Sequence, residues 1–434
     1  MLDIKFIRDN AKKVKQAVEH KKASANIDHL LSLDEQRRKL LVRIEDLRAK
    51  RNELNMLLKQ ARTDELIEQS RALKDELGKF ELEFIEIDRQ WMAEMLKVPN
   101  IPWKDVPVGQ DERENQTVFT WGAPRKFAFE PKDHMQLGHD LNLIDTESAA
   151  KVAGSRFGYL TGGLVQLQFA LINYVFTLLL NETELKKLAN SVEKGYPAKP
   201  FIPVIPPFMI KPEVYVKTSR LSEEDKDERY YLQKDDLYLI GSAEHTLVSK
   251  HMDEVLKASD LPLRYIGYST SFRRESGSYG KDVKGILRVH QFDKLEMESF
   301  TAASDSFKEH LFLIAIEEHI LQALDLPYRK LLKCTADIGM PNARGVDMEV
   351  WIPSQKTYRE THTADMMTDF QSRRLNIKLK SEKGENVLVH TNDATALAMP
   401  RVLIAILENY QQADGSVEVP EVLQKYTGFD VIKK

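Results

Sequence analysis

The chain has 434 residues, of which 42% are hydrophobic and 30% charged, a composition typical of a globular protein with about two or three domains. The net charge of −4 excludes a uniformly basic nucleic-acid-binding protein, so any RNA contact must come from a local basic patch. The single cysteine, Cys334, excludes a disulfide framework and a cysteine-rich zinc site, and it fits a reducing compartment.

The sequence contains no pattern typical of export or of a membrane span. Residues Met1–Lys5 lack the apolar core of a signal sequence. The most apolar long run, residues 164–180, is interrupted by Gln166, Gln168 and Asn173, which favours a buried helix over a membrane span. We therefore expect a cytoplasmic protein that does not contact a membrane.

The N-terminal part is predicted to be helical, with Asp3 as the N-cap of a first helix that extends through Ala17. Over residues 31–97, apolar residues recur every seventh position in two segments without an intervening proline. The break at Thr63 and Asp64 is short, so the two helices are predicted to be antiparallel neighbours in a coiled coil. The seam residues are Leu33, Leu40, Ile44, Leu47, Leu54 and Leu58, followed by Leu66, Leu73, Leu77, Phe80, Phe84, Ile87 and Trp91.

Charge is distributed unequally between these two helices. The first is rich in lysine and arginine, and the second in aspartate and glutamate. By itself the pattern favours an interaction or dimerisation coiled coil with a solvated charged face. The alternative is a basic arm that lies along an RNA backbone without reading its sequence. The candidate RNA-binding residues are Arg43, Arg48, Lys50 and Arg51.

Prolines over residues 99–116 predict a linker, and a second domain is expected from 117 to 434. Its elements begin with short helices over 134–143 and 147–152, a strand over 156–160, and the long helix over 162–180. Strands over 208–210 and 237–240 follow. Between the last of these and a helix predicted over 245–258 lies Gly241-Ser242-Ala243-Glu244, where Ser242 is either an N-cap or a ligand contact.

Two strands that flank a glycine-containing loop are predicted between residues 263 and 300. The loop is too long for a tight hairpin, which indicates a functional loop. Arg273 carries a planar fork suited to phosphate or carboxylate, and Glu275 can accept from an exocyclic amine. Phe292 can lie against a purine, and Glu296, on the same strand face, can hold an ammonium or hydroxyl. Each residue alone is compatible with an exposed salt-bridged hairpin; the joint pattern is far more specific.

This hairpin resembles motif 2 of the class II aminoacyl-tRNA synthetases, and its residue pattern is similar to that of the bacterial-type seryl-tRNA synthetases. The matching residues are Phe272-Arg273-x-Glu275, a loop with Gly277, Gly280 and Gly285, and Arg288-x-His290-Gln291-Phe292-x-Lys294-x-Glu296. The helix over 162–180 and the strand after Pro207 resemble motif 1, which builds a homodimer interface. Gly241-Ser242-Ala243-Glu244 resembles the Thr-Ala-Glu serine loop, with Ser242 where threonine is usual.

The C-terminal part extends the resemblance. Strands are predicted over 346–352, 357–361 and 387–391, and a helix over 401–410 carries the motif 3 arginine, Arg401. Two departures occur. The usual Glu-x-Ser-Ser becomes Glu360-Thr361-His362-Thr363, and the usual Asn-Gly-Ser-Gly becomes Asp393-Ala394-Thr395-Ala396, which keeps a hydroxyl but loses the glycines.

The resemblance implies an α+β fold, in which an N-terminal tRNA-binding domain over 1–98, with its long coiled-coil arm at about 31–97, precedes a catalytic domain over 117–434. That domain is expected to be a mainly antiparallel sheet of about six strands flanked by helices. It implies a serine–tRNA ligase that uses ATP and Mg²⁺. The partners would be L-serine, tRNA(Ser), tRNA(Sec) where present, and a second copy of the chain, but not DNA.

The resemblance also implies site residues. Catalysis is assigned to Arg273, Glu275 and Arg401. ATP contacts are assigned to Arg273, Arg274, Glu275, Arg288, Phe292, Glu360, Thr361, His362, Thr363 and Arg401. Serine contacts are assigned to Ser242, Ala243, Glu244, Arg273, Glu296 and Thr395. Metal contacts are assigned to Glu360 and Thr363. A ligase that loads a carrier protein and a non-catalytic paralogue are the rival functions; the helical arm argues against the first, and the intact arginines and glutamates against the second.

Overall fold

The computed structural model describes residues 1–275, 285–381 and 384–434, with the backbone alone at Glu224. It contains two compact units, Met1–Ile101 and Pro102–Lys434. The predicted linker over 99–116 is part of the second unit from Pro102 onward. There Gly109 N donates to Thr335 Oγ1 at 3.2 Å and Trp103 N donates to Ala343 O at 2.7 Å. The glycine-loop prediction at Gly277 and Gly280 lies outside the described residues.

The first unit begins with two short helices, α1 (Ile4–Asp9) and α2 (Ala11–His20). Asp3 caps α1 as predicted, because its side chain accepts from Lys5 N at 2.7 Å. The prediction of one continuous helix through Ala17 is wrong, since Asn10 leaves helical geometry and its side-chain amide donates to Phe6 O at 3.1 Å. An asparagine that hydrogen-bonds locally competes with the helix in this way.

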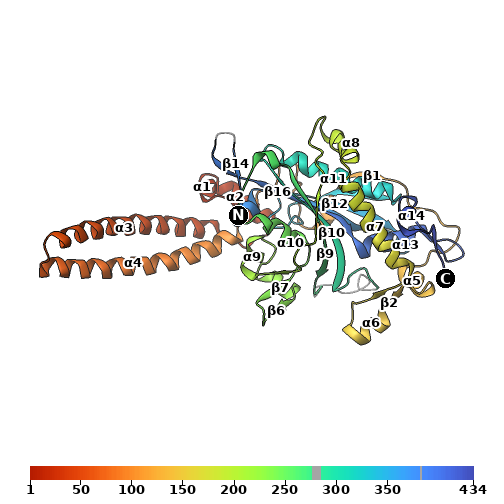
Figure 1. Ribbon diagram of the computed structural model, residues 1–434, viewed down its shortest axis with the longest axis horizontal. Helices are drawn as coiled ribbons and strands as arrows, with labels where there is room; N and C mark the ends of the chain where they lie inside the picture. Colours follow the sequence, from red (N-terminus) through yellow and green to blue (C-terminus); the bar gives the residue numbers. More distant parts are fainter. Residues whose placement is uncertain (276–284, 382–383) are drawn as a thin grey trace. The chain divides into compact units, whose positions relative to one another are not determined.

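A long helical hairpin, α3 (Ile27–Gln60) and α4 (Asp64–Lys97), forms the rest of the first unit (Figure 1). Leu40, Ile44 and Leu47 are buried on α3, and Leu77 is buried on α4, as the heptads predict. The first helix starts earlier than predicted because Asn26 caps it by accepting from His29 N at 3.0 Å.

Some of the basic residues of α3 form ion pairs with acidic residues of α4. Arg37 pairs with Asp88, Arg43 with Glu76 at 2.5 Å, and Arg48 with Glu81 at 2.8 Å. These pairs are half-exposed, so each contributes little to stability. Lys50 and Arg51 are exposed further along α3.

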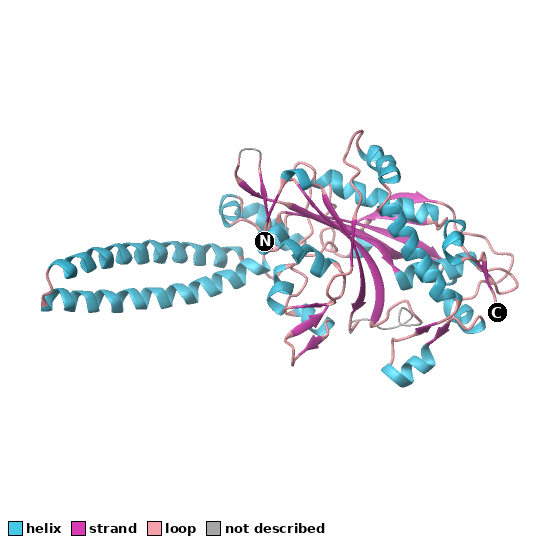
Figure 2. Ribbon diagram, in the orientation of Figure 1, coloured by secondary structure: helices cyan, strands magenta, loops and turns pink. Residues whose placement is uncertain are grey.

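The second unit is built on an eight-stranded sheet (Figure 2). Every neighbouring pair is antiparallel except β4 with β9, which is parallel. The predicted α+β class with a mainly antiparallel sheet is confirmed, with eight strands in place of about six. The strand order is β1 (Gln116–Trp121), β11 (Tyr328–Leu332), β12 (Arg344–Ile352), β13 (Thr357–Thr368), β16 (His390–Ala398), β10 (Gln291–Thr301), β9 (Leu263–Phe272) and β4 (Ile202–Val204).

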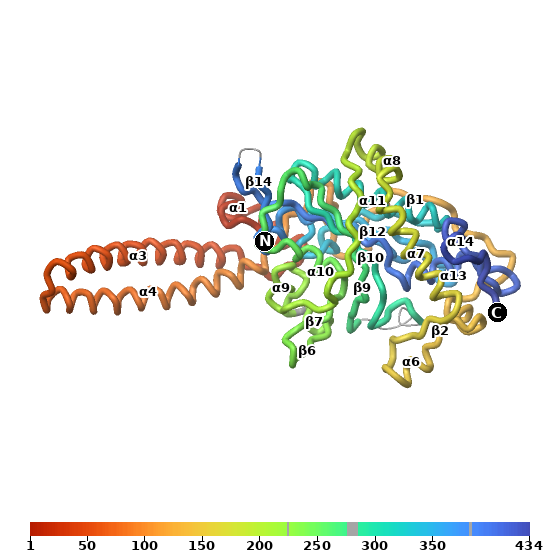
Figure 3. The backbone as a smooth tube through the Cα atoms, in the orientation of Figure 1, coloured from red at the N-terminus to blue at the C-terminus, as the bar shows by residue number. Residues whose placement is uncertain are grey.

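Smaller elements surround this sheet, and the chain path through them can be followed in Figure 3. Four short sheets contain β2 (Ile144–Asp145) with β3 (Tyr159–Leu160), β5 (Met209–Ile210) with β7 (Leu237–Leu239) and β6 (Tyr231–Leu232), β15 (Asn386–Leu388) with β14 (Lys378–Lys380) and β8 (Val255–Leu256), and β17 (Val417–Glu418) with β18 (Val431–Ile432). The helices are α5 (His134–Asp140), α6 (Thr146–Ala153), α7 (Gly163–Leu179), α8 (Glu182–Val192), α9 (Pro212–Lys217), α10 (Glu244–Leu247), α11 (Ser306–Ala323), α12 (Phe370–Leu375), α13 (Met399–Tyr410) and α14 (Glu421–Thr427).

The two faces of the large sheet differ in character. One face packs against α7, α11 and α13 in the main hydrophobic core, to which β10 contributes Leu295 and Met297. Because side chains alternate along a strand, Lys294, Glu296 and Glu298 of β10 point to the opposite face. That opposite face is the polar one, and it carries the candidate site.

Two sequence predictions about element boundaries are wrong. The helix predicted over 245–258 stops at His251, and Val255–Leu256 instead forms β8, which pairs in parallel with β14. The strand predicted over 387–391 is the end of β15 and the start of β16, which belong to different sheets. In both places tertiary strand pairing overrides local propensity.

Among the described residues no single helix is long and apolar enough to cross a membrane; the bent pair α7 and α8 meets the length and composition test only when taken together.

Candidate active site

A cavity of about 280 Å³ lies on the polar face of the sheet. Its walls come from β10, β13 and β16, from the starts of α10 and α13, and from the segments that follow β9 and precede β6, α10 and β10. Most of the side chains predicted from the sequence line this one cavity, although they are far apart in the chain. They are Ser242, Glu244, Arg273, Glu275, Arg288, Phe292, Glu296, Glu360, Thr361, Thr363, Thr395 and Arg401.

One end of the cavity is rich in arginine. The guanidinium of Arg273 lies over the Phe292 ring, 5.3 Å from its centroid, while its Nε donates to Gly241 O at 3.1 Å. Arg401 Nη1 donates to Glu360 O at 2.8 Å, and Arg288 Nη1 lies 3.2 Å from Glu275 Oε2. Burial, followed by repulsion from Arg229, lowers the pKa of Arg273. Clustered cations of this kind favour an anionic ligand.

Glu360 and Thr363 form an oxygen-rich pair on β13, beside Arg401. Thr363 Oγ1 donates to Glu360 Oε1 at 3.1 Å, and Arg401 Nη1 lies 3.3 Å from Glu360 Oε2. The Glu360 side chain is 47% exposed; the burial that remains would raise its pKa, but Arg401 and then Lys333 outweigh this effect and lower the pKa to about 2. Glu360 is therefore a carboxylate at any physiological pH.

His362 does not reach the cavity, because β13 contains a bulge. Glu360 pairs with Glu349 and His362 pairs with Met348, so Thr361 is an extra residue. The bulge keeps Glu360 and Thr363 on the cavity face and turns His362 to the core face. There His362 Nε2 donates to Ala396 O at 3.0 Å, and burial lowers its pKa to about 4, so the ring is neutral.

Two further predicted residues lie away from the cavity. Arg274 is exposed, with its Nε donating to Arg229 O at 3.0 Å and its guanidinium over the Tyr230 ring. Ala243 is buried in a satellite core with Leu247 beneath Gly267, where its methyl group packs and does not face the cavity. Strand alternation, which turns successive side chains to opposite faces, already separates Arg274 from its neighbour Arg273.

The other end of the cavity combines hydroxyls with a buried ion pair. Ser242 Oγ donates to Glu296 Oε2 at 3.0 Å, and Thr395 Oγ1 donates to Glu296 Oε1 at 3.5 Å. Glu296 also forms an ion pair with Lys294, a residue to which the sequence assigned no role. Ser242 Oγ in addition accepts from Glu244 N at 3.4 Å, so it serves the local turn as well as the cavity.

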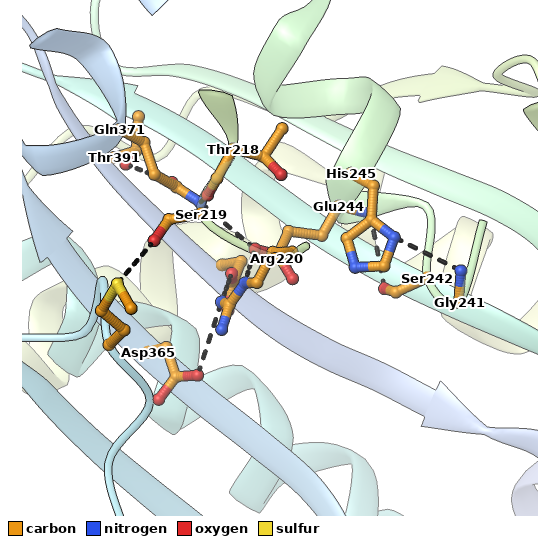
Figure 4. Close-up of polar contacts among 12 residues, drawn as sticks. Thr218, Ser219, Arg220, Gly241, Ser242, Glu244, His245, Asp365, Gln371 and Thr391 are labelled. Carbon is orange, nitrogen blue, oxygen red and sulfur yellow. Dashed lines mark hydrogen bonds and ion pairs between the residues drawn. The ribbon is translucent and has the colours of Figure 1, made fainter. Parts of the chain in front are cut away.

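Arg220 forms a network at this end that the sequence did not predict (Figure 4). Its Nε lies 2.6 Å from Glu244 Oε1, and its Nη2 lies 3.0 Å from Asp393 and 3.8 Å from Asp365. Arg220 outweighs the effect of burial and lowers the pKa of Glu244 to about 2. Gln371 of α12 also donates to Glu244 at 3.3 Å.

Glu298 extends the acidic side of this network into the protein interior. It is fully buried, it is the direct cross-strand partner of Asp393, and neither of its oxygens has a hydrogen bond within the described part of the chain. Burial, followed by repulsion from Glu244 and Glu296, raises its pKa well above 4.5. The folded protein therefore holds a proton that the unfolded chain releases above about pH 4.5, so this group lowers stability progressively as pH rises from there toward its folded pKa.

Glu298→Gln should remove that pH-dependent loss. Relative to wild type, the variant is expected to gain free energy of unfolding as the pH rises from about 5 to about 8, because glutamine has no proton to release on unfolding. Urea denaturation of both proteins at the two pH values measures this gain. An equal difference between the proteins at both pH values would show that Glu298 is not protonated in the folded state.

Comparison with known proteins gives one consistent result. A family model described as the Seryl-tRNA synthetase N-terminal domain matches residues 1–102, and one described as the tRNA synthetase class II core domain (G, H, P, S and T) matches residues 228–410. The chain is 39% identical to a serine–tRNA ligase of Petrotoga mobilis and 40% identical to one of Thermodesulfovibrio yellowstonii, in each case over the whole of both chains.

Solved structures agree with these matches. The seryl-tRNA synthetase from Pyrococcus horikoshii complexed with ATP superimposes with a TM-score of 0.87 at 37% identity. The cytoplasmic serine–tRNA ligase from Naegleria fowleri in complex with AMP superimposes with a TM-score of 0.84 at 28% identity. Both alignments cover 100% of this chain and 99% of the other.

Proposed function

We propose that this chain, which belongs to the seryl-tRNA synthetase family, activates L-serine with ATP and transfers serine to the 3′ end of tRNA(Ser), and to tRNA(Sec) where that tRNA is present. The observation that carries the proposal is the continuity of the cavity. One cavity joins the arginine-rich end, suited to a nucleotide, to the end where Ser242 and Thr395 surround Glu296. A nucleotide and a small hydroxyl-bearing amino acid would meet within it.

In the first step the serine carboxylate attacks the α-phosphorus of ATP and forms the mixed carboxylic–phosphoric anhydride of seryl-adenylate, while the bond between the α- and β-phosphates breaks and pyrophosphate leaves. In the second step a ribose hydroxyl of the tRNA end attacks the seryl carbonyl and AMP leaves. The chain supplies no nucleophile, so its contribution is positioning and charge neutralisation. Arg273 would hold the serine carboxylate and the α-phosphate together with its planar fork.

The remaining nucleotide contacts are proposed from the same cavity. Phe292 offers a ring to the purine, and Glu275 offers a carboxylate to its amine. Arg288 and Arg401 would hold the β- and γ-phosphates. Arg274 and His362 are left out of this set because one is exposed and the other is buried in the core.

The residues present suit Mg²⁺. Glu360 and Thr363 give an ionised carboxylate and a hydroxyl, hard oxygen donors of the kind that binds Mg²⁺ together with substrate phosphates. Bound there, the ion would neutralise phosphate charge during nucleotide binding. The positioning of both oxygens depends on the bulge at Thr361.

Three further proposals follow from family membership. The α3–α4 arm would bind the tRNA backbone through Arg43, Arg48, Lys50 and Arg51. Two copies of the chain would associate through the motif 1 region at α7 and Pro207. The protein would act in the cytoplasm, with the catalytic domain in the second unit and the tRNA-binding domain in the first.

Pyrophosphate exchange with each amino acid, followed by charging of tRNA(Ser), tests the proposed function. Serine should support exchange, and alanine should be rejected by roughly 10⁴-fold, because alanine leaves the buried hydroxyl-binding groups around Glu296 unpaired. Exchange with threonine, which has one more methyl group than serine, shows how much space the subsite leaves around Thr395. Exchange with alanine or threonine within about tenfold of serine would contradict this description of the subsite.

A further inference from the structure

Several carboxyl groups lie close together around Arg220. Glu298, Asp393 and Asp365 are direct cross-strand partners on β10, β16 and β13, so three acidic side chains share one row across the polar face. Glu244 approaches the same row from α10. Like charges directly opposite each other destabilise a sheet; Glu298 carries a proton, and the Arg220 guanidinium lies against Asp393 and Asp365.

Arg220 is the cation that compensates this row at the cavity. Its side chain is 17% exposed, and those of Glu244, Asp365 and Asp393 are 8%, 9% and 5% exposed. Burial lowers the pKa of Arg220, but Glu244, Asp393 and Asp365 outweigh burial and raise it above the ordinary arginine value. It is therefore a permanent cation.

Two lysines near the row form ion pairs with other carboxylates. Lys294 pairs with Glu296, and Lys333 lies 3.4 Å from Asp347 and 3.6 Å from Asp337. Loss of the positive charge of Arg220 would therefore leave the acidic row at this end of the cavity without its contacting cation.

The position of Arg220 relative to the hydroxyl-binding groups follows from the strands. Asp393, which Arg220 contacts, lies two residues before Thr395 on β16, a step of about 7 Å. Glu244, its other contact, lies two residues after Ser242. A charge on the amino-acid side chain would therefore lie about one such step from the guanidinium.

We propose that Arg220 is a specificity-determining residue that makes this end of the cavity reject a second amino group. Serine would be chosen over L-2,3-diaminopropionate, which has the same shape but carries an ammonium in place of the hydroxyl. This inference rests on the proposed function, because it takes the Ser242–Glu296–Thr395 end as the amino-acid subsite. Two like charges about 7 Å apart at an effective dielectric constant of about 20 repel enough to change affinity by roughly fiftyfold.

Arg220→Met tests the proposal, because methionine keeps an unbranched side chain and removes the charge. Pyrophosphate exchange would be measured with serine, diaminopropionate and alanine for wild type, Arg220→Met and Arg220→Lys. Wild type should prefer serine. In Arg220→Met the ratio of kcat/KM for diaminopropionate to that for serine should rise by about fiftyfold, and Arg220→Lys should keep the wild-type ratio. Arg220→Gln gives the same comparison should the methionine variant fail to fold.

A purely structural role for Arg220 would lower exchange with all three amino acids together and leave the ratio unchanged, which would overturn the proposal. A wild-type preference for diaminopropionate over serine would also overturn it, since the carboxyl row would then dominate over Arg220. Both results leave amino-acid activation intact. If wild type activates none of the three amino acids, the proposed function itself fails, and this inference fails with it.

Discussion

Arg273→Ala should reduce serine-dependent pyrophosphate exchange by at least about 10²-fold, the loss typical of removing one donor to a developing charge. Arg273 lines the cavity, lies over the Phe292 ring and has its pKa lowered by burial and by Arg229. Its burial beside Arg229 costs stability in the absence of an anion, and a bound anion offsets that cost. The variant should therefore fold normally, with a melting temperature equal to or above that of wild type.

The neighbouring residue provides a matched control. Arg274→Ala removes the same chemical group from the next position, but that side chain is exposed, does not line the cavity, and contacts the Arg229 carbonyl and the Tyr230 ring. It should leave exchange within a few-fold of wild type. Near-normal exchange in Arg273→Ala, or equal losses in both variants, would refute the role proposed for Arg273.

Features that depend on short stretches of chain could be predicted from the sequence. Asp3 caps a helix because the cap requires only the next few residues. The α3–α4 hairpin follows from heptads that need one partner, which lies next along the chain. The polar face of β10, with Phe292, Lys294 and Glu296 on it, follows from strand alternation.

Features that depend on strand register could not be predicted in this way. The sequence of β13 gives no sign that Thr361 is an extra residue, and regular alternation from Glu360 would place His362 rather than Thr363 on the same face. Only the pairing with β12 turns His362 away and brings Thr363 beside Glu360. A bulge is a property of two strands, and a single strand does not reveal it.

Arg220 illustrates a second limit. It lies in a segment that reads as a polar loop, and its partners Glu244, Asp365 and Asp393 are far from it in the chain. In the sequence, Asp393 stands out only as part of a departure from the family pattern. Asp365 reads as an ordinary residue of a strand. The charge row arises from the sheet order β13–β16–β10, which no local signal specifies.

The long arm allows the two chemical steps to be separated. The α3–α4 hairpin belongs to the first unit, whereas the residues that line the cavity belong to the second. Arg37 lies over the Trp91 ring, 4.7 Å from its centroid, so the chain ends left by removing residues 36–92 are close enough for a short linker. This deletion should leave serine-dependent pyrophosphate exchange within a few-fold of wild type and nearly eliminate charging of tRNA(Ser). Damage to both steps, with a changed sedimentation coefficient, would identify the arm as a dimerisation element.

Point substitutions can then test which charges on the arm contact RNA. Lys50→Gln with Arg51→Gln removes two exposed charges, and it should weaken tRNA charging and lower the salt dependence of tRNA affinity by a slope of roughly 0.9 or less for each phosphate that is no longer neutralised. Arg43 and Arg48 are different, because Glu76 and Glu81 already pair with them. The matched control is therefore Glu76→Gln with Glu81→Gln, which frees both arginines and should strengthen tRNA binding at low salt. If both double variants weaken binding equally, the hairpin acts through its shape, and the phosphate contacts proposed for its basic residues are wrong.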